Sequence, residues 1–208
     1  MLFLDEASEI PAGVLDALRI PLEKREVRLT RARREVVYPA EFQLVLAANP
    51  CACQRVKGQC SCKSPQRARH LSNVSGPLKD RLDVFVTTSG DAAVLSPRDA
   101  EPSIGIAERV AAARERAAVR WAKAGCNEDV NGRVPATLIR RHFPAKEAAM
   151  AMLQAELIQG KITQRGVDKC LKLAWTLADL EEMDQPDIHH ACRAVEMREH
   201  QLQREEVA

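Results

Sequence analysis

A nearly continuous apolar segment, Phe42 to Ala48, restricts the fold of this 208-residue chain more than any other feature. Strands that are buried on both faces lack polar alternation, and they occur almost only in parallel sheets whose faces helices cover. The first four residues and the segment Leu82–Val86 form further short apolar runs that are typical of strands. The first part of the chain is therefore predicted to have an α/β fold around a parallel sheet.

Other patterns in this part predict a helix and a hairpin. Residues 8–19 have the spacing of a short helix with Ser8 as its N-cap. Two extended runs, 27–30 and 36–38, flank a basic segment, which predicts a β-hairpin with a basic tip.

The second part of the chain carries only helical patterns. Residues 88–103 are rich in Ser, Gly and Pro and are predicted to be a linker. The helices expected after it cover 104–124, 145–159, 164–182 and 187–203. We therefore predict two domains, an α/β part over 1–95 and an all-helical part over 96–208.

Composition excludes several classes of protein. The sequence is 46% hydrophobic and 29% charged, as in globular domains, and has no apolar stretch near 18 residues, so no membrane-spanning helix is expected. Aromatic residues make up 3%, too few for a sheet that stacks RNA bases. The N-terminus lacks a basic leader, so we expect a cytoplasmic protein.

Two polar sites follow the predicted strands. Asp5 and Glu6 come directly after the first strand, where one carboxylate can bind Mg²⁺ through water and the other can polarise an attacking water. Asn49 ends the Phe42–Ala48 run, where its amide can reach the γ-phosphate of ATP or that water. Arg81 precedes the third apolar run and can reach into a neighbouring subunit's ATP site, although a single arginine at such a position is more often a partner in a surface ion pair.

Four cysteines lie within twelve residues, at positions 51, 53, 60 and 62. Four thiolates on a short loop can close a tetrahedral Zn²⁺ site and hold a loop that has few apolar residues. Free or redox-active thiols and disulfides are the alternatives. The segment 51–81 carries seven basic residues against one acidic residue, which suits nucleic acid or phosphate as a partner; a solvated surface without a partner is the alternative. The candidate contacts to the DNA backbone are Arg31, Arg33 and Arg34 at the hairpin tip, with Lys57, Lys63, Arg67 and Arg69.

Taken together, these motifs resemble the AAA+ ATPases of the magnesium-chelatase-like YifB/ComM group. The matching segments are Leu2–Glu6 (LFLDE), Leu44–Cys53 (LVLAANPCAC), Ser75–Asp83 (SGPLKDRLD), Asn131–Pro135 with Leu138–Phe143 (NGRVP, LIRRHF), and Thr163–Gly166 with Leu173–Leu180 (TQRG, LAWTLADL). The resemblance implies the second half of an AAA+ core followed by a helical lid, with ATP and Mg²⁺ as cofactors. It also implies assembly into a ring, expected to be a hexamer, that acts on DNA as a branch-migration helicase.

The resemblance implies a role for five residues. Asp5 and Glu6 correspond to the Walker B pair, Asn49 to sensor 1, Arg81 to the arginine finger and Arg165 to sensor 2. Chelatase subunits proper, which remodel a metal-inserting partner, are the alternative with the same fold, and the resemblance implies that they lack the cysteine cluster. A non-enzymatic protein that binds zinc and nucleic acid is a further alternative.

One departure from the family pattern concerns the phosphate-binding loop. The sequence contains no G-x-x-x-x-G-K-[ST] segment, and its single Gly-Lys pair, Gly160-Lys161, is followed by Ile162. We therefore expect this chain to be the C-terminal portion of a longer family member, either through truncation or through a start codon assigned too late.

Overall fold

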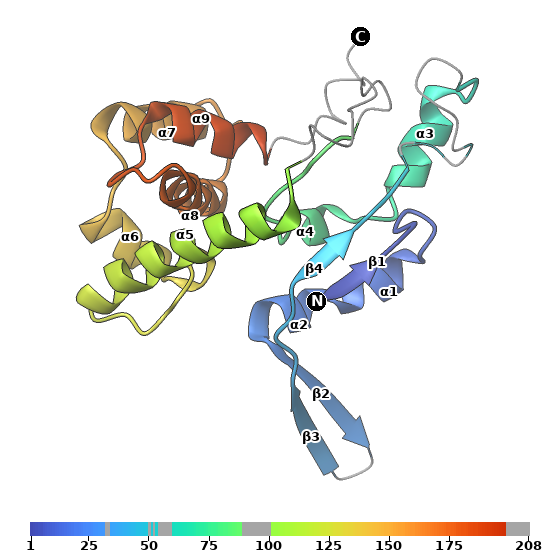
Figure 1. Cartoon of the computed structure of the whole chain (residues 1–208). Coiled ribbons are helices and arrows are strands. Elements are labelled where there is room, and N and C mark those ends of the chain that lie inside the picture. Colours follow the sequence, from blue (N-terminus) through green and yellow to red (C-terminus); the bar gives the residue numbers. More distant parts are fainter. Residues whose placement is uncertain (32–33, 50, 52, 54–59, 89–100, 199–208) are drawn as a thin grey trace. The chain divides into compact units, whose positions relative to one another are not determined.

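The computed structural model describes residues 1–31, 34–49, 51, 53, 60–88 and 101–198. They divide into two compact units, the first over residues 1–82 and the second over residues 83–198 (Figure 1). Among the described residues, no helix is both long and apolar enough to cross a bilayer. The fold is a mixed α/β fold with a small parallel sheet, as the sequence predicts.

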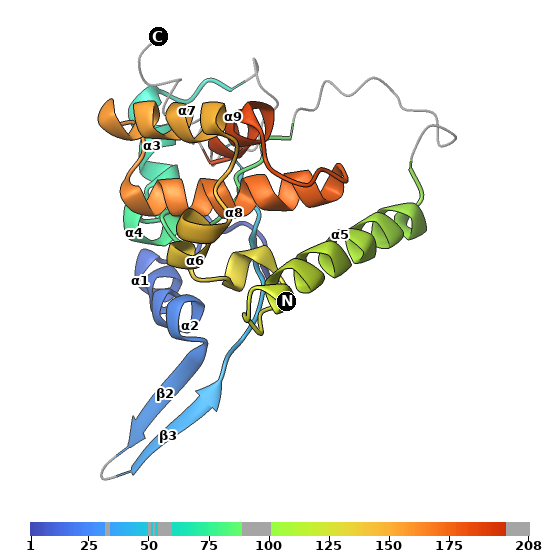
Figure 2. The same ribbon diagram turned by 90° about the vertical axis from the view of Figure 1, so that its left-hand side faces the viewer.

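The parallel sheet of unit 1 contains strands from distant parts of the sequence. Strand β1 (Leu2–Leu4) pairs in parallel with β4 (Leu44–Leu46), with Leu4 opposite Leu46. The predicted hairpin is confirmed as β2 (Glu26–Arg31) and β3 (Arg34–Pro39), which pair antiparallel. Figure 2 shows this hairpin extending away from the rest of unit 1.

The helices of unit 1 are short. They are α1 (Ala12–Ala17), α2 (Arg19–Lys24), α3 (Ser64–Leu71) and α4 (Gly76–Lys79). The prediction that Ser8 caps the first helix is wrong, because α1 begins after Pro11 and Ser8 is buried with 2% of its surface exposed. The buried hydrophobic residues described in unit 1 are Ala7, Leu15, Cys51 and Leu78.

Two strand predictions are also corrected. The segment Phe42–Ala48 forms a strand only over Leu44–Leu46, and these residues are half-buried rather than buried. Within the described residues β4 pairs with β1 alone, in a sheet of two strands. Residues 82–86 form no strand; instead the Phe85 N–H donates to the Met197 carbonyl at 2.7 Å, so the apolar run is tied to a helix end.

Unit 2 is a helical bundle around α8. Its elements are α5 (Ser103–Lys123), the 3₁₀ turn η1 (Asn131–Arg133), α6 (Ala136–His142), α7 (Glu147–Ile158), α8 (Gln164–Leu180) and α9 (Ile188–Glu196). Helix α8 lies among α5, α6, α7 and α9 in both views (Figures 1 and 2). The rings of Trp121, Phe143 and Trp175 meet edge to face in the core.

The four predicted helices are present as α5, α7, α8 and α9. The predicted stops after α5 and α7 are confirmed, since Gly125 and Gly160 adopt left-handed backbone conformations with φ of 71° and 70°. Helix α6 was not predicted. Helix α9 ends at Glu196, earlier than the predicted residue 203. Residues 199–203 and most of the predicted linker lie outside the described residues.

A buried polar network joins α5, η1 and α8. The Asp179 carboxylate, 1% exposed, accepts hydrogen bonds from the Arg120 guanidinium and, at 2.8 Å, from the Asn131 side chain. The same Asn131 side chain accepts from the Trp121 ring N–H at 2.9 Å. Arg120 also lies over the Trp175 ring, 3.9 Å from its centre. These bonds satisfy polar groups that would otherwise destabilise the core.

Candidate nucleotide and metal sites

The carboxyl edge of the parallel sheet carries the predicted acidic pair. Because β1 and β4 run in the same direction and Leu4 lies opposite Leu46, Asp5–Glu6 and Asn49 both leave the same edge. The segments that follow the two strands are hydrogen-bonded to each other. The Ala47 N–H donates to the Leu4 carbonyl at 2.9 Å, and the Ala7 N–H donates to the Ala47 carbonyl at 2.8 Å. The parallel register thus brings the predicted carboxylates and the predicted amide to one edge.

The backbone turns sharply at the acidic pair. Glu6 adopts a left-handed conformation with φ of 50°, which is uncommon for a residue with a long side chain. The Asp5 carboxylate accepts a hydrogen bond from the Glu6 N–H at 2.9 Å. Both residues are exposed, so both carboxylates are accessible to a hydrated cation and to water.

Asn49 is exposed and its backbone is held from outside the sheet. The carbonyl oxygen of Asn49 lies 3.2 Å from Nε2 of His70, near the end of α3. His70 was not predicted to be part of the site, because a single histidine in a basic stretch gives no signal of a long-range backbone contact.

Arg81 follows the short helix α4, which Ser75 caps by accepting from the Leu78 N–H. Its guanidinium forms an ion pair with Glu23 at 2.8 Å and donates to the Pro77 carbonyl at 2.7 Å. The side chain of Arg81 is 15% exposed, against 48% for Glu23. In this structure, therefore, Arg81 is docked on its own unit.

Arg165 lies in the first turn of α8 and is exposed. Thr163 caps this helix by accepting from the Gly166 N–H at 3.1 Å. One turn along, Lys169 forms an ion pair with Asp83 at 2.9 Å. Burial lowers the pKa of Lys169, and the positive charges of Arg198 and Arg165 lower it further, while Asp83 opposes the shift. Arg165 therefore belongs to a cationic cluster of unit 2.

The four cysteines of the loop after β4 come together. Their sulfur atoms all lie within 4.8 Å of one another, and the Cys53 and Cys60 sulfurs are 3.4 Å apart. Cys51 is buried and the other three are half-buried. Hydrogen bonds with Cys51 and then with Cys53 raise the pKa of Cys62 to about 12. This donor set fits a metal ion that prefers thiolates.

The basic hairpin has two different faces. Because side chains alternate along each strand, the pairs Val27–Tyr38, Leu29–Val36 and Arg31–Arg34 share one face. The opposite face carries Arg28, which forms ion pairs with Glu26 at 2.7 Å and Glu35 at 3.3 Å.

The remaining predicted basic contacts fall near α3 or cannot be placed. Lys63 precedes the helix, and Arg67 and Arg69 lie within it; Lys63 and Arg69 are exposed. Arg33 and Lys57 lie outside the described residues. The described positions leave the predicted DNA contacts on two elements of unit 1, the hairpin tip and α3.

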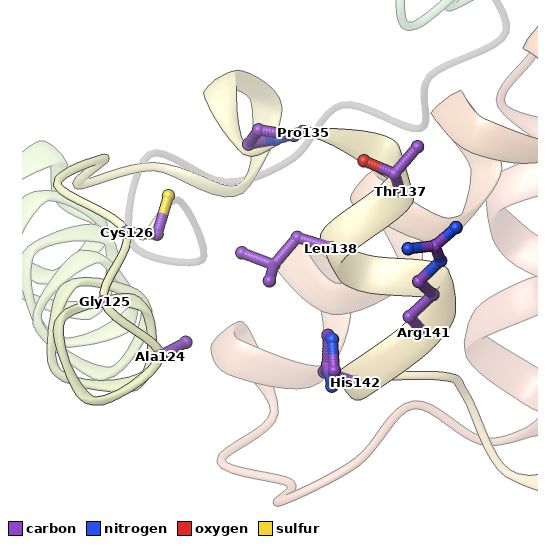
Figure 3. A pocket seen from close by; sticks show the side chains of 8 residues that line it. All are labelled: Ala124, Gly125, Cys126, Pro135, Thr137, Leu138, Arg141 and His142. Atoms are coloured by element: carbon purple, nitrogen blue, oxygen red, sulfur yellow. The ribbon is translucent and has the colours of Figure 1, made fainter.

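An open pocket of about 380 Å³ lies in unit 2 between the end of α5 and α6. Figure 3 shows Leu138 pointing into it, with Cys126 on the opposite wall and Arg141 and His142 on α6. The residues lining it include no carboxylate that could hold Mg²⁺. The pocket therefore does not have the chemistry of the predicted nucleotide site.

Comparison with known proteins assigns both halves of the chain. The family model described as magnesium chelatase, subunit ChlI, matches residues 1–94. The family model described as the C-terminal region of this subunit matches residues 100–198. An uncharacterized protein of Mycobacterium tuberculosis is 43% identical over 201 residues, which are 96% of this chain and 40% of that protein.

Two further relatives carry names. YifB of Escherichia coli is 34% identical over 202 residues, 95% of this chain and 39% of YifB. The competence protein ComM of Haemophilus influenzae is 32% identical over 200 residues, 94% of this chain and 38% of ComM. The chain thus spans about two fifths of the length of the curated relatives that it matches. With two family models and these relatives covering nearly all of it, the chain belongs to the magnesium-chelatase-like family that includes YifB and ComM.

Proposed function

We propose that this chain supplies the hydrolytic edge and the helical lid of an ATP-driven ring motor that acts on DNA. The observation that carries the proposal is the parallel register of β1 and β4, which brings Asp5, Glu6 and Asn49 to one sheet edge. Ligands in open α/β sheets bind outside the carboxyl ends of the strands, and these three residues follow the carboxyl ends of β1 and β4.

Each residue of this edge has a chemical task in the proposal. Asp5 holds Mg²⁺ through water, and Glu6 accepts a proton from, or orients, the water that attacks the γ-phosphate of ATP. The Asn49 amide hydrogen-bonds that water or the phosphate. Arg165 contacts nucleotide phosphate from the lid. A phosphate cradle of the P-loop kind has to come from residues that this sequence does not contain.

Arg81 completes the site of a neighbouring subunit. Its partner Glu23 is 48% exposed, so water reaches this carboxylate, and a phosphate of higher charge can take its place beside Arg81. Arg81 can reach a neighbour's site only if the chains self-associate. In a closed hexameric ring, every subunit makes the same contact with the next one.

A chimera tests the proposed hydrolysis. The sequence of the Mycobacterium tuberculosis relative upstream of the matched 201 residues is joined to this chain at Met1, with the intact relative as the control for folding. The chimera should hydrolyse ATP, and Glu6→Gln should lower the turnover by on the order of 10²-fold or more. The 208-residue chain alone should show no turnover.

Two outcomes contradict the proposal. The first is a folded chimera that binds ATP but whose turnover does not depend on Glu6. The second is hydrolysis by the chain alone that disappears on Glu6→Gln. The DNA upstream of Met1 provides an independent test, since an in-frame P-loop sequence within roughly 60–90 codons marks a start assigned too late. Its absence there favours the non-enzymatic alternative that binds zinc and nucleic acid.

DNA binding is tested on the hairpin. Arg31 and Arg34 share the apolar face at the tip, while Arg28 on the other face is already paired with two glutamates. Replacing both tip arginines by alanine should reduce the slope of log K against log salt by about 2, roughly one for each phosphate that is no longer neutralised. Arg28→Ala is the matched control and should leave the slope nearly unchanged; equal effects of the two variants would exclude the tip as the DNA-binding element.

A chelatase-type subunit is the second candidate function, because both matching family models describe a magnesium chelatase subunit. Such a subunit remodels a metal-inserting protein and has no need of DNA. Stimulation of the chimera's turnover by DNA, abolished when the two tip arginines are replaced, separates the motor on DNA from this candidate.

A further inference from the structure

Helix α3 connects the four-cysteine cluster with the residue proposed as sensor 1. Its first residue, Ser64, follows Cys62 by two positions, and the cluster itself begins two positions after Asn49. Near the other end of the helix, His70 contacts the Asn49 carbonyl at 3.2 Å. The chain therefore leaves Asn49, passes through the cysteines and returns to Asn49 at the end of α3.

The end of α3 also holds the loop that follows β1. Nδ1 of His70 lies 3.3 Å from the Glu9 carboxylate, and the His70 side chain is only 8% exposed. Just beyond the helix, the Asn73 side chain donates to the Ser8 carbonyl at 2.6 Å. One short segment thus binds both loops that leave the parallel strands, including the loop that carries Asp5 and Glu6.

Helix α3 is short and mostly polar in sequence. Its sequence, SPQRARHL, contains few apolar residues, and isolated helices of this length are marginal in water. A segment of this kind needs an anchor other than hydrophobic burial, and a metal ion bound by several side chains is a common one.

The cysteine geometry fits such an anchor. Four sulfurs at the corners of a tetrahedron with Zn–S bonds of about 2.3 Å lie about 3.8 Å from one another. The four sulfurs all lie within 4.8 Å of each other, and the Cys53 and Cys60 sulfurs are 3.4 Å apart. Only small movements of the side chains are therefore needed to reach tetrahedral coordination. Binding releases the thiol protons, and the positive charge of the ion then holds the four thiolates together.

We propose that Cys51, Cys53, Cys60 and Cys62 bind one Zn²⁺, and that this ion acts through α3 to hold the backbone of Asn49 and the loop after β1 in place. The ion is a structural part of the sheet edge, and its loss loosens that edge. The metal site stands on the sulfur geometry alone; only its consequence for ATP hydrolysis depends on the proposed function.

The first test measures the metal. The full chain, purified from zinc-replete cells, should contain close to one zinc per chain by mass spectrometry under native conditions. Cys60→Ser should lose it, while Cys192→Ser, which alters a half-buried thiol of α9, should retain it. Absence of zinc from the unaltered chain, or equal loss in both variants, overturns the site.

The second test measures the connection through α3. Hydrogen exchange of the Ala7 and Ala47 amides, which join the two strand exits, reports on the sheet edge. Removing zinc with a chelator should speed this exchange about tenfold, which corresponds to the loss of one or two hydrogen bonds. His70→Ala should do the same while the zinc remains bound.

Amides elsewhere in the chain serve as internal controls for the second test. The β2–β3 hairpin has its own hydrogen bonds, and the helices of unit 2 have their own core, so amides there should exchange at unchanged rates. If zinc removal leaves the exchange rates of the Ala7 and Ala47 amides unchanged, the proposed effect of zinc through α3 is wrong, even if the metal binds. Neither test uses ATP, so failure of the hydrolysis experiments leaves this result intact, and the reverse also holds.

Discussion

Replacing Asp179 with asparagine should destabilise unit 2 by about 3 kcal/mol. The Asp179 side chain is 1% exposed and pairs with the Arg120 guanidinium, which is 14% exposed. Removing one partner of a buried ion pair costs about 3–5 kcal/mol, because the other charge stays buried without compensation. The slight exposure of Arg120 allows water to reach it, which places the expected loss at the lower end of this range.

The variant retains the shape of the side chain and removes its charge. An asparagine amide can still bond Asn131, but it presents an amide nitrogen in place of one of the two carboxylate oxygens that Arg120 contacts. The loss therefore measures the charge of the network rather than a cavity.

Urea unfolding followed by tryptophan fluorescence is the assay. Both tryptophans, Trp121 and Trp175, lie in the core of unit 2, so the signal reports on this unit. Asp129→Asn is the matched control, because Asp129 is 68% exposed and its pair with Arg133 should contribute less than about 1 kcal/mol. A loss for Asp179→Asn no larger than that of the control would refute the reasoning.

Three further predictions concern catalysis, pH and backbone conformation. In rings of the active chimera, Arg81→Ala should lower turnover on the order of 10³-fold with ATP binding intact, and mixing with Glu6→Gln subunits should restore part of it; mixed rings that stay inactive contradict a role in trans. Burial alone would raise the pKa of Asp187, but hydrogen bonds from His190 outweigh it and lower the pKa. Asp187 is the N-cap of α9, so its ionised form stabilises the fold above the ordinary aspartate pKa, and this stabilisation is lost as the pH falls through the lowered value. Asp187→Ala should therefore cost about 1 kcal/mol at pH 7 in urea titrations and less in acid. A cost that does not depend on pH contradicts this. Gly160→Ala should cost about 1 kcal/mol by the same assay because φ is 70° there, and an unchanged midpoint contradicts it.

The sequence predicted elements well where one local signal decides them. Helices α5 and α7 end at the glycines that were expected to stop them, and the hairpin follows from two extended runs around a polar tip. The parallel pairing of β1 and β4 was predictable because an apolar run of that kind is typical of a parallel strand.

The failures share a physical cause, which is that the deciding contact lies far away in the sequence. The run 82–86 has the composition of a strand, but its Phe85 bonds a helix end more than a hundred residues later. Ser8 has the residue type of an N-cap, but it is buried and its carbonyl accepts a hydrogen bond from the Asn73 side chain. The contact of His70 with Asn49 depends on how the cysteine loop returns, and no residue pattern encodes that path.

The left-handed backbone at Glu6 has a consequence for how this gene changes over time. A glutamate with φ of 50° costs on the order of 1 kcal/mol relative to glycine, so replacement by glycine would by itself make the fold more stable. In a gene under no selection for hydrolysis, this gain favours substitution, and changes at this codon should accumulate. Sequencing the gene from many isolates, and comparing changes at this codon with those at exposed codons nearby, therefore distinguishes a working motor part from a decaying one without purifying any protein.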